Sequence, residues 1–176
     1  MSELVFGKIK GLPVNSNVVT VPAGHTLYAP GHVIQVQSVT KVDSWTTSSA
    51  SYVDVTGMAV DITPKYATSK IMVMATVSAA QVTNSDGLFQ LLRGATIIGN
   101  GTFGSLVNGF GQVTSSYPNG IANQSITYLD SPATTATQTY KIQGRVYSGG
   151  TLCVNRRGVD GAFGTSSSIT VMEIAA

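Results

Sequence analysis

Apolar and polar residues alternate with a period of two along much of the chain, which is the pattern of half-buried β-strands. In the segment 140–147 the even positions hold Tyr, Ile, Gly and Val, whereas the odd positions hold Lys, Gln, Arg and Tyr. No apolar stripe with the 3.6-residue period of a helix continues for more than about two turns. The segment therefore predicts a strand with one buried and one solvated face.

Further strands are predicted wherever such alternation is bounded by turn residues. Gly, Pro, Asn and Asp punctuate the chain at 84–87, 93–94, 117–120, 130–132 and 148–150. The predicted strands cover 17–21, 33–42, 52–64, 70–77, 86–98, 110–116, 124–130, 140–147, 151–156 and 167–175. About eight to ten short strands at this spacing predict an all-β fold, a jelly-roll or related β-sandwich.

The strand predicted at 52–64 contains a change of phase. Val53 and Val55 occupy odd positions, whereas Met58, Val60 and Ile62 occupy even ones. A shift of one residue would turn the core face of a strand outward, so something between the two halves has to absorb it. We expect Gly57 to form a β-bulge or a tight corner.

The strand predicted at 70–77 is apolar on both faces. Its odd positions are Ile, Val, Ala and Val, and its even positions include Met72 and Met74. The opposite sheet of a sandwich covers one face only, so the second face indicates a further covering surface. Met72 and Met74 are therefore candidate contacts with another subunit, and a small lid or loop over the same face would explain the pattern equally well.

Residues 1–32 differ from the rest of the chain. Gly and Pro punctuate them too densely for a regular sheet, and the sequence around His25 is echoed around His32. We predict an extended N-terminal arm and collar over 1–32, followed by the body at 33–176. Exposed apolar side chains of such an arm would lie on a neighbour, by strand addition. The candidate partner-binding residues of the arm are Leu4, Val5, Phe6, Lys8, Ile9 and Lys10.

Composition narrows the class of protein. Only 10% of the 176 residues are charged, 43% are hydrophobic and the net charge is +2, whereas about 25% charged residues is usual. A chain of this kind is not disordered. No apolar run reaches the roughly 20 residues of a membrane span, and the first residues do not form a signal peptide. Cys153 is the only cysteine, so an intrachain disulfide and a cysteine-rich zinc site are excluded.

Candidate catalytic chemistry is sparse. The run Gly99-Asn-Gly-Thr-Phe-Gly104 matches the spacing of a dinucleotide-binding loop, but a helix-forming sequence and a suitably placed acid do not follow it. The eight acidic residues are scattered, and no Ser lies in a nucleophile elbow. We expect no enzyme activity, no catalytic residues and no cofactor.

Two further groups of residues are candidate binding sites. His25 and His32 would each supply three imidazoles around a threefold axis, which could bind a metal, or both are ordinary loop histidines. Lys141, Arg145, Arg156 and Arg157 could form a small basic patch. The isoelectric point of about 8.7 on so few charges is low for a nucleic-acid-binding domain. We expect neither nucleic acid nor membrane as a partner.

Several stretches resemble one family, the small β-domains of tail-fibre and virion structural proteins of tailed bacteriophages. The resemblance spans about residues 20–176, and the order and spacing of the stretches make it specific. The residues that carry it are Val21–Val36, Tyr52–Gly57 with Ile62–Pro64, Thr68–Val73, Leu92–Gly94 with Ile98–Gly99, Leu129–Pro132, Thr139–Gln143 and Ser168–Ala175.

This resemblance implies a jelly roll of the complement and tumour-necrosis-factor type that assembles as a homotrimer. It implies a virion protein, assembled in the host cytoplasm, without catalytic residues or an organic cofactor. A trimer interface would also account for the low charge, because charged residues are depleted at the core of interfaces.

The resemblance leaves two roles open. Domains of this family often follow a long fibre shaft, whereas Met1 lies only about 30 residues before the predicted body. This departure favours a capsid decoration or cement protein, a trimer that grips a phage capsid protein through its arms. The alternative is a tail-fibre or receptor-binding module, with tail proteins and a host surface receptor as partners. For that role Phe103, Phe110, Tyr117 and Phe163 are candidate exposed aromatics.

Overall fold

The computed structural model describes residues 21, 23, 27, 29–82, 85–101, 108–114 and 120–176. These residues are all-β, and they include no helix that could cross a membrane. The strands are β1 (Val33–Lys41), β2 (Trp45–Thr47), β3 (Val53–Ile62), β4 (Lys70–Val82), β5 (Asp86–Arg93), β6 (Thr96–Ile98), β7 (Gly111–Thr114), β8 (Ala122–Asp130), β9 (Gln138–Val146), β10 (Thr151–Val154) and β11 (Ser167–Ile174).

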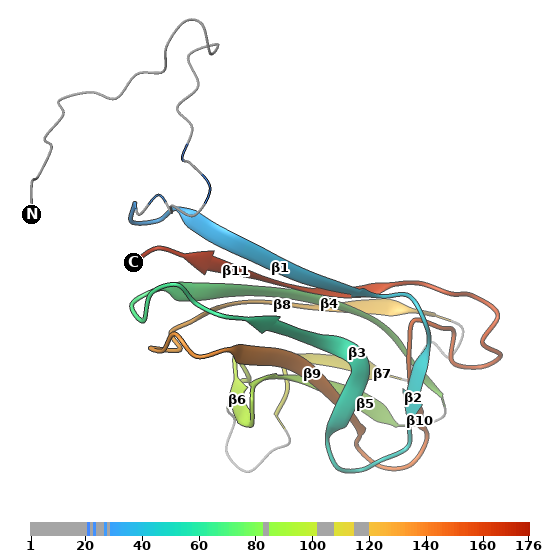
Figure 1. Cartoon of the computed structure of the whole chain (residues 1–176). Helices are drawn as coiled ribbons and strands as arrows, with labels where there is room; N and C mark the ends of the chain where they lie inside the picture. Colours follow the sequence, from blue (N-terminus) through green and yellow to red (C-terminus); the bar gives the residue numbers. More distant parts are fainter. Residues whose placement is uncertain are drawn as a thin grey trace, which may run out of the picture.

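Two antiparallel sheets lie face to face (Figure 1). Sheet A has the long strand β4 at its centre: β8 pairs with one edge, and β10 and β11 pair one after the other with the other edge. β1 then flanks β11, and β2 flanks β10. In sheet B, β9 lies between β3 and β5, and β6 and β7 pair with the far edge of β5.

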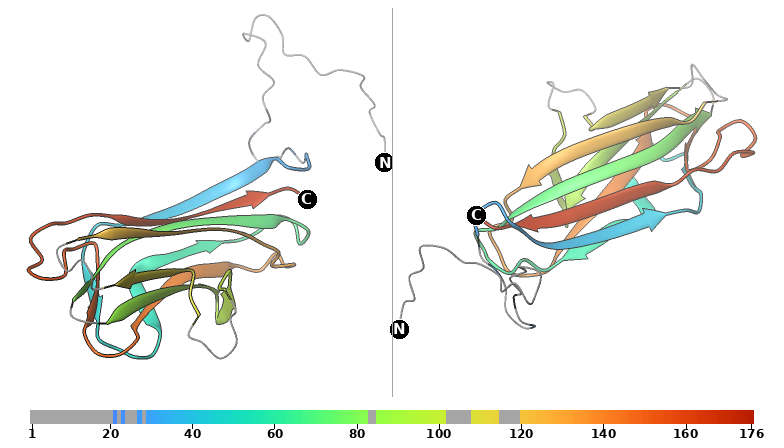
Figure 2. Two further views of the ribbon diagram at one scale, coloured as in Figure 1. Left: turned by 180° about the vertical axis from the view of Figure 1, so that it is seen from behind. Right: turned by 90° about the horizontal axis from the view of Figure 1, so that it is seen from above.

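This strand order is that of a jelly roll. Sheet A reads β1, β11, β4, β8 and sheet B reads β3, β9, β5, then β6 and β7. The chain therefore crosses repeatedly between the sheets, and among the described strands only β5 and β6 are both consecutive in sequence and paired. Four positions in each sheet and antiparallel pairing throughout define the double Greek key. The right-hand view of Figure 2 shows β8, β4, β11 and β1 side by side in orange, green, red and blue. The predicted fold class is confirmed.

The core lies between the sheets and follows the predicted alternation. Tyr140, Ile142 and Val146 of β9 are fully buried, whereas Lys141, Gln143 and Arg145 face outward and are only partly buried. In β4 the buried inner positions are Ile71, Val73, Ala75 and Val77. Burial of these aliphatic side chains supplies the main stabilisation of the sandwich.

Gly57 forms the predicted bulge. The register of β3 against β9 shifts between Asp54 and Ala59, and Gly57 has a φ of 84°. Val55 and Met58 on either side of it are both buried. Glycine adopts this left-handed conformation without strain, so the bulge keeps both halves of β3 facing the core.

The structure corrects several predicted elements. The segment 86–98 is not one strand, because Gly94 with a φ of 57° turns the chain between β5 and β6. β4 continues to Val82, five residues beyond the predicted end. β2 was not predicted, since three residues are too few to show a period. The prediction at 17–21 lies outside the described residues except for Val21, which is in no strand.

Buried polar contacts hold the two sheets together at one end. The Asp130 carboxylate at the end of β8 accepts hydrogen bonds from Arg93 Nη1 of β5 and from the Tyr140 hydroxyl of β9, each at 2.7 Å. Burial, followed by the Asp130 carboxylate, raises the pKa of Tyr140 well above its ordinary value. Tyr140 therefore stays protonated and donates to Asp130. This contact joins a strand of sheet A to two strands of sheet B.

A second buried carboxylate anchors the loop between β3 and β4. Glu173 of β11 is fully buried and accepts hydrogen bonds from the backbone N–H of Lys65 at 2.7 Å and from Gln35 Nε2 at 2.6 Å. Nearby, Gly31 and His32 pair with Ala175 through backbone hydrogen bonds of 2.7 and 2.9 Å. The chain therefore enters the body beside its own C-terminus.

Candidate functional site

The outer face of sheet A presents rows of side chains that run across its four principal strands. Cross-strand partners lie on the same face of a sheet, so the register defines each row. The first row consists of Val36, Met172, Met72 and Leu129, on β1, β11, β4 and β8 in that order. We call this set the apolar row.

The apolar row is accessible along its whole length. Val36 is 50% exposed and Leu129 is 51% exposed, and Met72 and Met172 between them are partly buried. In the adjoining row Met74 is 36% exposed. The structure therefore places Met72 and Met74 on an outward surface that the described residues leave uncovered, and no described lid or loop explains their apolar character.

The next two rows are rich in hydroxyl groups. Ser38, Thr170 and Thr127 flank Met74, and the third row holds Thr40, Ser168, Thr76 and Ser125. Several of these hydroxyls bond one another, as Ser38 with Thr170 at 2.8 Å and Thr76 with Ser125 at 3.1 Å. None of the three rows contains a charged residue. Hydroxyls that are paired with each other can be buried against a partner at little cost.

The outer face of sheet B has the opposite character. The Asp54 carboxylate accepts hydrogen bonds from Lys141 Nζ at 2.9 Å and from Gln143 Nε2 at 2.7 Å. These bonds, first that of Lys141 and then that of Gln143, hold the pKa of Asp54 below its ordinary value. Gln90 extends the network with a 2.6 Å bond to Gln143. On this face, the polar groups of Asp54, Lys141, Gln143 and Gln90 therefore bond one another.

The other predicted residues are distributed as follows. The arm residues Leu4, Val5, Phe6, Lys8, Ile9 and Lys10 lie outside the described residues, as does His25. His32 belongs to no cluster of potential metal ligands within the described ranges. Of the four basic residues, Lys141 and Arg145 lie on the outer face of sheet B, whereas Arg156 and Arg157 belong to the loop after β10.

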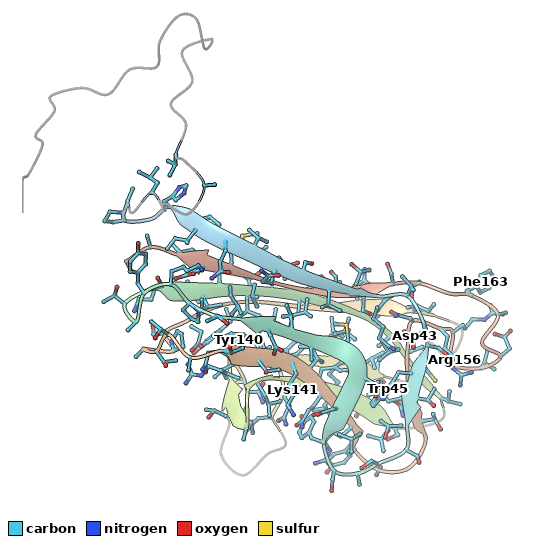
Figure 3. The ribbon with its side chains drawn as sticks, in the orientation of Figure 1. Asp43, Trp45, Tyr140, Lys141, Arg156 and Phe163 are labelled. Atoms are coloured by element: carbon cyan, nitrogen blue, oxygen red, sulfur yellow. The ribbon has the colours of Figure 1, made fainter. Side chains whose placement is uncertain are left out.

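The candidate aromatics also separate. Phe103 and Tyr117 lie outside the described residues. Phe110 packs against the core, with its ring 6.3 Å from that of Phe89, which is ordinary core packing. Phe163 is 59% exposed in the loop between β10 and β11, with the Arg157 guanidinium 4.4 Å from its ring centroid. Figure 3 shows Phe163 at the end of the sandwich away from the C-terminus.

Sequence reasoning missed three members of the apolar row, Val36, Leu129 and Met172. Each lies in a predicted strand, but alternation within one strand does not reveal which residues of other strands are its neighbours. Met72 and Met74 were found because they break the apolar–polar alternation of their own strand. The row itself depends on the register of four strands that are distant in sequence.

Comparison with known proteins finds similarity of fold alone. No protein-family model matches the sequence, and no curated protein matches it. The fold is similar to chains of infectious bursal disease virus: the Gx strain at 11% identity and a TM-score of 0.41, and the Gt strain at 12% identity and a TM-score of 0.42. Both matches cover 90% of this chain and 42% of the viral chain.

A third similar structure is that of T=1 particles derived from the same virus, at 9% identity and a TM-score of 0.40. It covers 90% of this chain and 41% of the viral chain, so the chain spans about two fifths of the length of the structures it matches. Likenesses at these scores assign neither a family nor a function. The jelly-roll assignment rests on the strand order described above.

Proposed function

We propose that this protein is a non-enzymatic structural protein of a bacteriophage virion, a homotrimeric capsid decoration protein anchored through its N-terminal arm. The observation that carries the proposal is the apolar row on the outer face of sheet A, together with the two uncharged, hydroxyl-rich rows on one side of it. The assignment to a bacteriophage and the threefold assembly rest on the resemblance of the sequence to virion β-domains.

The character of this face supports contact with another copy of the chain. Single exposed apolar residues are common on soluble proteins, but a continuous apolar row next to uncharged rows is typical of an interaction surface. Met72 and Met74 contribute flexible thioether side chains that adapt to an opposing surface. A trimer in which this face meets a neighbour would bury the apolar row and leave the polar face of sheet B outside.

The predicted N-terminal arm is the basis for the proposed attachment to the capsid. Three arms carried by one trimer engage a shell together, so weak individual contacts add up to firm attachment. The collar enters the body beside the C-terminus, since Gly31 and His32 pair with Ala175. The described part of the chain therefore begins its first strand at the same end of the sandwich as the C-terminus.

Deletion of residues 1–20 tests the role of the arm. We expect the truncated protein to remain trimeric and to lose binding to purified capsids in a sedimentation assay, because the apolar row is retained and the clamp is removed. The full chain, mixed with the same capsids, serves as the control. A truncated protein that still co-sediments with capsids would contradict anchoring through the arm.

A tail-fibre or receptor-binding module is the second candidate function, and the exposed Phe163 favours it. An aromatic side chain at the free end of a sandwich is a suitable contact for a receptor. Antibody-gold labelling of intact virions separates the two roles. Gold distributed over the head supports decoration of the capsid, whereas gold confined to the tail would make the protein a fibre module.

A further inference from the structure

A cavity of about 610 Å³ opens beside sheet B. It lies where the outer face of sheet B meets the edge at β6, and its lining includes Tyr52, Gln90, Asn100 and Arg145, together with Tyr128 of β8. A cavity of this volume is in the range that holds a small organic ligand.

Arg145 makes the cavity electropositive. Within the described residues its guanidinium lies in no ion pair, and the described lining contains no carboxylate. Its carbon atom Cζ is 5.6 Å from the centroid of the Tyr52 ring, and its Nε donates to the Val146 carbonyl at 3.2 Å. These contacts orient the guanidinium and leave it without a compensating charge. A planar fork of N–H donors in this setting is suited to a carboxylate.

Asn100 supplies a second polar group without a partner. Its Oδ1 atom is buried and accepts no hydrogen bond from the described residues. A buried acceptor without a donor destabilises the folded protein. Because amide side chains turn easily about χ2, Oδ1 can rotate toward a donor in the cavity without breaking an existing bond of its own. A hydroxyl group on a ligand would relieve the cost.

Aromatic and aliphatic side chains complete the lining. The Tyr52 hydroxyl donates to the Asn108 carbonyl at 2.6 Å, which fixes the position of that ring. Tyr128 and the half-exposed Ile97 add further apolar surface. Tyrosine presents an apolar ring beside a polar hydroxyl, and such a surface suits a ligand that alternates C–H groups and hydroxyls.

We propose that this cavity binds an acidic pyranose, a sugar ring that carries a carboxylate. The carboxylate pairs with Arg145, ring hydroxyls bond the amides of Asn100 and Gln90, and the C–H face of the ring packs on the tyrosines. A neutral sugar lacks the partner for Arg145, and a simple carboxylate lacks the hydroxyls and the apolar face. Both parts of the ligand are therefore needed for full affinity.

Isothermal titration calorimetry on the full chain, with D-glucuronic and D-galacturonic acid as probes, tests this proposal. We expect a Kd on the order of 1 mM for at least one of the two, and binding at least about tenfold weaker for D-glucose and for acetate. No heat of binding with either uronic acid at about 20 mM would overturn the proposal. Acetate binding as tightly as the uronic acids would overturn it as well, since the site would then recognise charge alone.

Two variants with matched controls sharpen the test. Arg145→Gln should weaken uronic acid binding at least about tenfold, whereas Lys141→Gln, on the same strand and face but outside the lining, should change it less than about twofold. Asn100→Leu should weaken binding and leave the melting temperature unchanged or raised, because it removes an unsatisfied buried group. A lowered melting temperature with unaltered binding would assign Asn100 a structural role and contradict its place in the site.

Discussion

The outer faces of the two sheets differ in the kinds of side chain that they expose. On sheet B, the charged and amide groups of Asp54, Lys141 and Gln143 bond one another across strands β3 and β9. On sheet A, the apolar row crosses four strands and two uncharged, hydroxyl-rich rows adjoin it on one side, with Lys70 on the other side. Polar groups that bond one another are stable in contact with water. Exposed apolar side chains such as those of the apolar row are stabilised when another surface covers them.

The difference lies in side-chain chemistry, because both sheets have the same backbone plan. Each has four strand positions and antiparallel pairing, and each buries its inner face against the other. The fold alone therefore does not say which surface makes contacts. The outward positions of each strand decide it, and on sheet A those positions leave burial against a partner as the favourable state.

A charge placed in the apolar row or in the row beside it gives the largest expected effect. Met72→Asp or Met74→Asp should dissociate the trimer, because an unpaired carboxylate at a buried interface costs about 3 kcal/mol or more. That cost corresponds to at least about 100-fold weaker association. Sedimentation velocity measures the change. Both variants remaining trimeric at micromolar concentration would place the interface elsewhere.

A matched pair of substitutions compares the two faces directly. Leu129 on sheet A and Ile97 on sheet B are 51% and 53% exposed, so an aspartate meets a similar environment in the isolated chain. Leu129→Asp should weaken the trimer at least about tenfold, and Ile97→Asp should leave it intact. Light scattering on a dilution series gives both results. Equal dissociation by the two variants would mean that the faces do not differ in function.

Removal of the buried Asp130 contact, which joins sheet A to sheet B, should lower the stability of the whole sandwich. Asp130→Ala leaves Arg93 without its carboxylate and the buried Tyr140 hydroxyl without an acceptor. We expect the free energy of unfolding to fall by about 3 kcal/mol, from urea denaturation. Asp61→Ala, which removes an exposed carboxylate bonded to Thr139, is the control and should cost less than about 1 kcal/mol.

The polar network of sheet B gives the smallest expected effect. Asp54→Asn should cost no more than about 1 kcal/mol at neutral pH, because the ion pair with Lys141 is partly exposed and screened. The pKa of Asp54 is lower in the folded protein than its ordinary value of 3.8. The stabilisation is therefore complete above pH 3.8 and is lost as the pH falls through the folded-state pKa.

Denaturation curves of the wild type and of Asp54→Asn at a series of pH values measure this effect. The difference between the two proteins should be constant near neutral pH and should vanish below the folded-state pKa of Asp54. A difference that grows on acidification would show that the Asp54 carboxylate does not stabilise this face.

The sequence predicted the parts of the fold that depend on local patterns. Alternation fixed the buried face of β9, and the change of phase in β3 located the bulge at Gly57. The strand predicted at 86–98 was kept whole in spite of the turn signal at Gly94, because apolar residues continue on both sides of it, whereas the structure divides it into β5 and β6. β2 was missed because its three residues are ordered by their pairing with β10, which is remote in sequence.

The candidate sites show the same division between local and tertiary information. Met72 and Met74 could be recognised from their own strand, whereas their alignment with Leu129 and Met172 required the register of the sheet. The cavity beside Arg145 was not predicted at all. Its lining residues come from β5, β6, β8, β9 and adjoining loops, and no periodicity in the sequence connects them.

The molar mass of the full chain in solution tests the central claim most directly. One chain has a mass of 18.3 kDa. Multi-angle light scattering should give three times this mass for the wild-type protein, because the proposed homotrimer buries the outer face of sheet A between copies. A mass of one chain at the highest concentrations measured would contradict the account, since the apolar row would then remain exposed to water.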